Sequence, residues 1–207
     1  MIHPKYQKPE VLKFINENLM NRLEKAHLLA NTSDKFRNVF CHRDAWDRNI
    51  LFKYDSITGK PINCVFVDYQ LSRYSPPAVD VLFTLYLNTN QQLRSELMAP
   101  ALRYYHSCLM EKIEESGIPT TELLNWQQFE ESCNYVKFIV IVLKAICAPL
   151  THLPTDWSEH IRMNDPKKFN YYMTCNRDEM ILNLMEKYEN YKSIILESVA
   201  EVVDYIL

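Results

Sequence analysis

The sequence predicts a mainly α-helical protein with one small β-hairpin, which belongs to the α+β fold class. Apolar residues recur at three- and four-residue intervals over residues 9–30 and over much of the chain after residue 76, and this spacing places them on one face of a helix. Runs of β-prone residues are confined to residues 39–67. Hydrophobic residues make up 47% of the chain, which is enough for a packed core. We therefore expect helix to exceed half of the residues and strand to stay below about 15%.

The first expected helix covers residues 9–30, and Pro9 suits its first turn. Its apolar residues follow helical spacing at Leu12, Ile15, Leu19, Leu23 and Ala26. A short strand over residues 39–41 then leads into a polar segment.

A hairpin is expected next, with strands over residues 50–54 and 64–67. The residues between them, 55–61, are rich in turn formers. Asn49 precedes the first strand and Asp68 follows the second. Because antiparallel pairing brings these two strand ends together, we expect the side-chain oxygens of Asn49 and Asp68 within roughly 7 Å of each other, close enough to share one ion.

The rest of the chain is expected to be helical, apart from one loop. Helices are predicted over residues 77–88 and 91–116, and the second ends at a Gly-Ile-Pro sequence. A helix over 122–148 is apolar on several faces, which predicts a central, buried position. Pro149 and Pro154 predict a loop through about residue 175, and helix is expected from about 176 to the end.

One set of polar residues has the spacing that phosphoryl transfer requires. His42, Asp44 and Asn49 form an H-x-D-x-x-x-x-N pattern, and Asp68 ends the apolar run that follows. Phosphoryl transfer needs a carboxylate beside the attacking hydroxyl and oxygen ligands that hold magnesium against the phosphates. Asp44 fits the first role. Asn49 and Asp68 fit the second, because magnesium takes few protein oxygens and leaves its other positions to phosphate and water.

These residues lie in a longer stretch that resembles the ecdysteroid kinase-like family, also called CHK kinase-like. Members typically carry an H-G-D-x-W-x-x-N-I-x-F-x-Y-D run, and residues 42–55 read H-R-D-A-W-D-R-N-I-L-F-K-Y-D. A V-D-F-Q-x-S-R run follows in the family, where residues 67–73 read V-D-Y-Q-L-S-R. A P-x-x-D-L run comes last, and residues 77–81 read P-A-V-D-V.

The resemblance implies a protein-kinase-like fold, grouped with choline kinases and aminoglycoside phosphotransferases. It implies that residues 1–207 are one C-terminal lobe, with a catalytic core over 39–87 and a helical subdomain over 88–207. The implied activity uses ATP and Mg²⁺ to phosphorylate a hydroxyl of an ecdysteroid-like or other lipophilic alcohol. Asp44 and His42 would be the catalytic residues, with His42 bracing the loop, and Asn49 and Asp68 would hold the metal and the nucleotide. Asp80 would accept hydrogen bonds from the same loop.

Two departures from the family pattern leave a second interpretation open. Arg43 stands where the family has glycine, and the chain has two glycines in all, so it contains no glycine-rich phosphate loop. We expect the N-terminal nucleotide lobe to be absent and the chain to be inactive without it. The alternative is a catalytically silent pseudokinase or binding module, or a truncated gene product. A protein kinase is disfavoured, because the sequence at 68–70 is D-Y-Q rather than D-F-G.

Composition excludes several other classes of protein. The net charge is -3, which argues against nucleic acid or a membrane surface as a general partner. The polar opening residues predict no secretory leader, and the apolar run 136–150 is expected to be too short and too charged to span a bilayer. The six cysteines lack metal-site spacing, so we expect reduced, mostly buried thiols in a cytoplasmic protein.

The missing lobe also predicts an uncovered apolar surface. We expect self-association through this surface, because large exposed apolar patches mark partner sites. The side chains expected to be exposed there are Ile2, Tyr6, Val11, Phe14 and Phe36.

Overall fold

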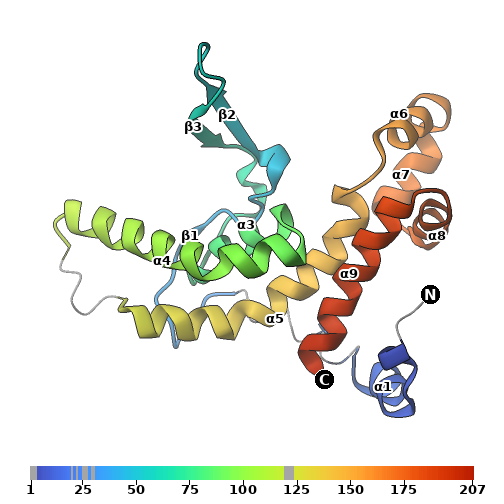
Figure 1. Cartoon of the computed structure of the whole chain (residues 1–207), viewed down its shortest axis with the longest axis horizontal. Coiled ribbons are helices and arrows are strands. Elements are labelled where there is room, and N and C mark those ends of the chain that lie inside the picture. Colours follow the sequence, from blue (N-terminus) through green and yellow to red (C-terminus); the bar gives the residue numbers. More distant parts are fainter. Residues whose placement is uncertain (1–3, 20, 22, 25–27, 29–30, 119–123) are drawn as a thin grey trace. The chain divides into compact units, whose positions relative to one another are not determined.

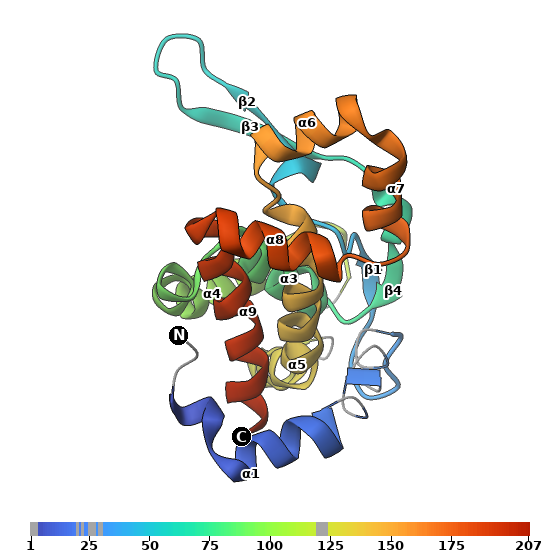
Figure 2. The same cartoon turned by 90° about the vertical axis from the view of Figure 1, so that its right-hand side faces the viewer.

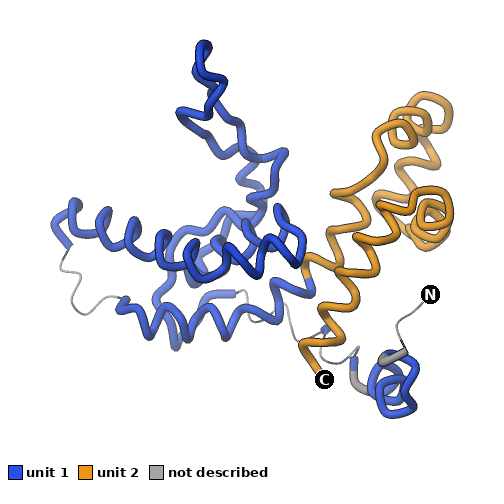
Figure 3. Tube along the Cα trace, in the orientation of Figure 1, with its two compact units in different colours: residues 1–142 blue, residues 143–207 orange. Residues whose placement is uncertain are grey.

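The computed structural model describes residues 4–19, 21, 23–24, 28, 31–118 and 124–207. It is 69% helical with a small antiparallel β part, which confirms the expected fold class. The chain divides into two compact units, Met1–Val142 and Leu143–Leu207 (Figure 3).

The first unit begins with short helical segments. A 3₁₀ turn, η1 (Pro4–Gln7), precedes α1 (Pro9–Phe14), and one turn of π-helix, η2 (Ile15–Leu19), follows it. Pro9 occupies the first turn of α1, as expected from its fixed φ and missing N–H. The expected helix over 9–30 is thus helical through residue 19, and much of its remainder lies outside the described residues.

Four short strands form two separate antiparallel pairs. β1 (Val39–Cys41) pairs with β4 (Arg73–Ser75), with Cys41 opposite Arg73. β2 (Ile50–Tyr54) pairs with β3 (Pro61–Phe66), with Ile50 opposite Phe66. The expected hairpin is therefore present, and it extends away from α3 and α4 in both views (Figures 1 and 2). The sequence did not predict β4, which is only three residues long.

Two helices of the first unit match their predicted ranges closely. α3 (Ala78–Asn88) starts directly after Pro76 and Pro77, and α4 (Gln91–Glu115) starts after Asn90. The Asn90 side chain accepts a hydrogen bond of 2.9 Å from the Leu93 N–H, which caps a donor left free by helix geometry. Gly117 follows α4 with a φ of 74°, a conformation that glycine adopts at no steric cost.

The long helix α5 (Trp126–Thr151) extends three residues beyond its predicted end and contains Pro149. The predicted start at residue 122 lies outside the described residues. Buried side chains run along much of the helix, as predicted: Phe129, Cys133, Val136, Ile139, Val140, Ile141, Val142 and Ala148.

By length and composition α5 could cross a membrane, with a mean hydropathy of 1.7 over its most apolar window. This differs from the expectation that its apolar run is too short and too charged. Half of that window is buried inside the protein, as in the core helix of a globular protein.

The second unit contains the end of α5 and four further helices. They are α6 (Thr155–Asn164), α7 (Pro166–Thr174), α8 (Asp178–Lys187) and α9 (Glu189–Ile206). The predicted loop through residue 175 is therefore wrong, because α6 and α7 occupy most of it. Pro154 and Pro166 stand at helix starts, and the Asp165 side chain accepts a hydrogen bond of 2.9 Å from the Lys168 N–H. The helix expected from 176 onward is interrupted at Tyr188.

The core of the second unit combines apolar packing with a buried ion pair. Its buried cluster consists of Ala148, Tyr172, Met180, Leu184, Tyr191 and Ile195. Lys144, only 6% exposed, lies 2.7 Å from a Glu201 carboxylate oxygen and 3.1 Å from one of Glu197. These partners compensate for the cost of burying the ammonium group.

Two surface expectations differ from the structure. All six cysteines are free, but only Cys41 and Cys133 are buried, so the expectation of mostly buried thiols is wrong. Val11 and Phe36, expected to be uncovered, are 4% and 7% exposed. Tyr6 and Phe14 are half-buried, and Ile2 lies outside the described residues.

Candidate active site

The loop of residues 42–49 connects β1 to β2 and is anchored by Asp80 in the first turn of α3. The two Asp80 carboxylate oxygens accept backbone N–H groups, one from His42 at 2.6 Å and one from Arg43 at 2.8 Å. Bonds from amides to a carboxylate are among the stronger hydrogen bonds in proteins. Asp80 therefore fixes the backbone of the loop, as the sequence predicted.

His42 is buried and uses both ring nitrogens to join the loop to the hairpin. Its Nδ1 accepts the Asp44 N–H at 3.2 Å, so its Nε2 carries the proton and donates to the Val67 carbonyl at 2.9 Å. The ring also packs against Phe66 and Tyr69, with centroid distances of 5.7 and 4.5 Å. In this arrangement His42 positions the loop, because neither nitrogen is left to exchange a proton with a ligand.

Asp44 and Asn49 are held together inside the loop. The Asn49 Nδ2 donates to the Asp44 backbone carbonyl and to the Asp44 Oδ2, both at 2.9 Å. Burial raises the pKa of the Asp44 carboxyl, the hydrogen bond from Asn49 opposes this, and the negative charge of Asp68 raises the pKa further.

Asp68 follows β3 and lies at the same end of the hairpin as Asn49. The Val67 N–H donates to the Asn49 carbonyl at 3.0 Å, which continues the β2–β3 pairing to the point where both strands end. Asp68 has a φ of 65°, and its exposed carboxylate accepts a hydrogen bond of 3.3 Å from the Gln70 side chain. The expected approach of the Asn49 and Asp68 side-chain oxygens to within roughly 7 Å stays a prediction.

The donor atoms at this end of the hairpin fit magnesium. Asn49 uses its Nδ2 on Asp44, so its Oδ1 is the atom that would be offered to a metal, and Asp68 would offer a carboxylate. Magnesium bound beside phosphates usually takes only one or two carboxylates from the protein. A cluster of three His, Cys, Asp or Glu side chains is absent from the described part of the chain, but such a cluster is not needed for this type of site.

An apolar pocket of about 530 Å³ adjoins the 42–49 loop. This volume lies within the range of small-molecule sites. The loop contributes His42 and Ala45, which flank Asp44 in the chain. The full lining is Phe40, His42, Ala45, Phe66, Tyr69, Asp80, Val81, Thr84, Leu85, Ala101 and Tyr105. We call this hollow the loop pocket.

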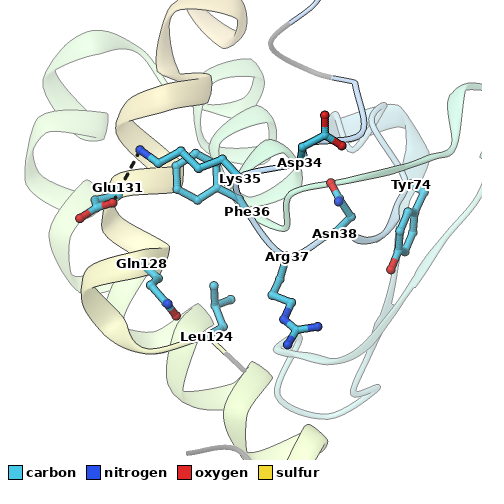
Figure 4. A pocket seen from close by; sticks show the side chains of 9 residues that line it. All are labelled: Asp34, Lys35, Phe36, Arg37, Asn38, Tyr74, Leu124, Gln128 and Glu131. Carbon is cyan, nitrogen blue, oxygen red and sulfur yellow. Dashed lines mark ion pairs between the residues drawn. The ribbon is translucent and has the colours of Figure 1, made fainter. Parts of the chain in front are cut away.

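A second pocket of about 570 Å³ lies elsewhere in the first unit and contains none of the candidate site residues (Figure 4). Figure 4 shows Lys35 directed at Glu131, with the ion pair measuring 3.9 Å between Nζ and Oε2. Most of its lining side chains are exposed and polar, which is the ordinary state of a solvated surface.

Arg43 stands where the family pattern has glycine, and its backbone conformation is unusual. Arg43 has a φ of 65°, in the left-handed region that costs about 1–2 kcal/mol for a residue with a Cβ. The Asp80 hydrogen bond to the Arg43 N–H holds this conformation.

Replacing Arg43 by glycine is expected to relieve this strain. Because Arg43→Ala also removes the guanidinium group but keeps the Cβ, it is the matched control. We expect Arg43→Gly to be more stable than Arg43→Ala by about 1 kcal/mol, measured as the free energy of urea unfolding. Equal stability of the two variants would contradict the assignment of backbone strain.

Some features of the site were not predicted from sequence. The aromatic contacts of His42 with Phe66 and Tyr69 join residues that are far apart in the chain, and only the β-propensity of Phe66 hinted at its place. The ring of Trp46 packs against Arg48, whose guanidinium carbon is 5.3 Å from the ring centroid.

Comparison with known proteins gave one match. The family model described as "Ecdysteroid kinase-like family" matches residues 2–118, more than half of the chain. Searches of curated proteins and of solved structures returned no match.

Proposed function

Because the chain belongs to the ecdysteroid kinase-like family, we propose that it carries the phosphoryl-transfer site of an ATP-dependent small-molecule kinase. The observation that carries this proposal is the 42–49 loop. Its Asp44 carboxylate is held by Asn49, and its backbone is anchored by Asp80. The loop therefore presents a carboxylate in a fixed position beside candidate metal ligands.

In the proposed reaction, each residue has one role. Asp44 orients the acceptor hydroxyl and accepts its proton, and burial, which raises the Asp44 pKa, makes it a better proton acceptor than a solvated aspartate. Asn49 and Asp68 hold Mg²⁺, which neutralises charge on the phosphates when bound. His42 and Asp80 keep the loop in place. Most of the rate gain then comes from positioning and electrostatic stabilisation.

The loop pocket supports a lipophilic acceptor. Its walls are mainly aromatic and aliphatic. Its few polar side chains include Asp80 and Thr84, whereas both ring nitrogens of His42 are already used. Such a lining binds an apolar body and orients it through a small number of hydrogen bonds. We propose an ecdysteroid-like or other lipophilic alcohol, bound with its apolar part in the loop pocket and its hydroxyl at Asp44.

Filling the loop pocket tests this assignment. Ala101 lines it from α4, whereas Ala99 is an exposed residue of the same helix outside the lining. We expect Ala101→Trp to raise the KM for a steroid-sized alcohol about tenfold or more, and Ala99→Trp to have little effect. The measurement is the KM for the alcohol at saturating ATP in a form of the protein that turns over. Equal KM values in both variants would place the acceptor elsewhere.

The phosphate-covering part of a kinase is not among these residues, because the chain has only two glycines. We propose that the 207 residues alone bind ATP weakly and transfer little phosphate. The same small number of glycines also favours the alternative, a catalytically silent binding module. Restoring turnover by adding a nucleotide-binding lobe would support the kinase. Ligand binding in the loop pocket with no turnover in any form would support the binding module.

Exposed apolar side chains on the hairpin support self-association. Every residue of β3 is exposed, and several large apolar side chains of the hairpin are more than half exposed: Leu51, Tyr54, Ile57, Ile62 and Val65. A two-stranded hairpin is marginally stable by itself. We expect sedimentation velocity to show concentration-dependent association, which Ile62→Lys with Val65→Lys should reduce. A stable monomer at high concentration would contradict this.

A further inference from the structure

The 42–49 loop has two arginines beside it that no part of the proposed reaction uses. Arg43 lies in the loop two residues after β1 ends, and Arg73 opens β4. Because Cys41 of β1 pairs with Arg73, both arginines lie at the same end of the β1–β4 pair.

This end of the β1–β4 pair has a surplus of hydrogen-bond donors. Neither guanidinium group makes an ion pair or a hydrogen bond within the described residues. The Arg43 Nε and the Oγ of Ser72, which precedes Arg73 in the chain, are shielded from solvent and have no partner there. The negative charge of Asp80 acts on Arg43, but the two Asp80 oxygens already accept the backbone N–H groups of His42 and Arg43.

Cys41 lies opposite Arg73, and Arg43 follows Cys41 by two residues, so the strand register places the two arginines near each other. Burial lowers the pKa of Arg43, and the positive charge of Arg73 lowers it further. Of the Arg43 nitrogens only Nε is shielded, so the two Nη groups reach solvent. Arg73 is exposed as a whole. A ligand can therefore approach both arginines from solvent.

We propose that Arg43 and Arg73 form an oxyanion site that takes a phosphate group. Paired guanidinium groups offer forked N–H donors that match tetrahedral phosphate, and such pairs are stronger than neutral hydrogen bonds. An anion there would offset the repulsion between the two arginines. Because Arg43 is adjacent to Asp44 in the chain, occupancy would steady the 42–49 loop.

The test is calorimetric titration of the 207-residue chain with inorganic phosphate, without magnesium or nucleotide and at constant ionic strength. We expect Arg43→Gln and Arg73→Gln each to weaken phosphate binding about tenfold. The matched control is Arg37→Gln, which removes an exposed arginine of the same unit and should leave the affinity within about twofold. Because Arg73 is exposed at a strand end, its variant should fold even if that of Arg43 does not.

A second titration, with phenyl phosphate, distinguishes the two possible sources of the anion. Tighter binding of the ester than of phosphate would indicate a phosphorylated molecule as the natural ligand, whereas tighter binding of inorganic phosphate would indicate the free ion. Equal weakening in all three arginine variants, or no binding by the unmodified chain, would overturn the proposal. Stronger phosphate binding in Asp44→Asn, with unchanged binding in the arginine variants, would do the same. Loss of the Asp44 charge would then have relieved repulsion of an anion at the reacting atoms. Turnover is not measured, so failure of the kinase assignment would leave the result interpretable.

Discussion

Replacing Asp44 by Asn is expected to lower kcat for phosphoryl transfer about 10²- to 10⁴-fold, the usual contribution of a positioned general base. The variant keeps the shape of the side chain and an oxygen that can accept the Asn49 Nδ2, which donates to Asp44 Oδ2 at 2.9 Å in the unmodified protein. It loses the negative charge that orients the hydroxyl and the ability to take its proton. The measurement is single-turnover phosphorylation of a lipophilic alcohol, in a form of the protein that carries a phosphate-covering lobe.

Asp47→Asn is the matched control for this variant. Asp47 belongs to the same loop but is exposed, so its loss should change kcat by less than about twofold. Both variants should unfold at a temperature close to that of the unmodified protein. This result would separate an effect on catalysis from an effect on folding. Full activity of Asp44→Asn would remove Asp44 from the reaction.

Replacing Asp68 by Asn is expected to lower the rate about 10²- to 10³-fold at a fixed, low magnesium concentration, the scale on which a lost electrostatic partner of the transition state acts. Asp68 has a φ of 65°, and asparagine tolerates this conformation, so the variant removes charge without adding backbone strain. Raising the magnesium concentration should restore part of the rate, because the remaining ligands still bind the ion weakly.

The magnesium dependence separates a ligand from a merely structural residue. For Asp68→Asn, the magnesium concentration that gives half of the maximal rate should rise. For the exposed control Asp47→Asn, this concentration should not change. An unchanged magnesium dependence in Asp68→Asn would show that Asp68 is not a ligand.

The sequence predicted the parts of the site that depend on local pattern. Two β-prone runs and a turn-rich connection predicted the hairpin, and the family resemblance implied that Asp80 accepts hydrogen bonds from the loop. These features depend on residues close in sequence or on a spacing shared with the family, so pattern alone was sufficient.

Other parts depend on contacts between distant residues, which pattern does not contain. β4 is three residues long and exists through its pairing with β1, more than thirty residues earlier. The helices α6 and α7 were missed because Pro149 and Pro154 were interpreted as loop formers, although proline also stands at helix starts, as Pro154 does at α6 and Pro166 at α7. Val11 and Phe36 are buried because tertiary packing covers them, and no local signal predicts that.

The position of the metal tests the account most directly. A crystal of the chain grown with Mn²⁺ in place of Mg²⁺, and with an ATP analogue, would locate the ion through its anomalous scattering. The account predicts one ion in direct contact with the Asn49 Oδ1 and an Asp68 carboxylate oxygen, at distances near the ~2.1 Å typical of magnesium. An ion bound elsewhere, or side chains of Asn49 and Asp68 directed to opposite faces of the hairpin, would contradict the phosphoryl-transfer site.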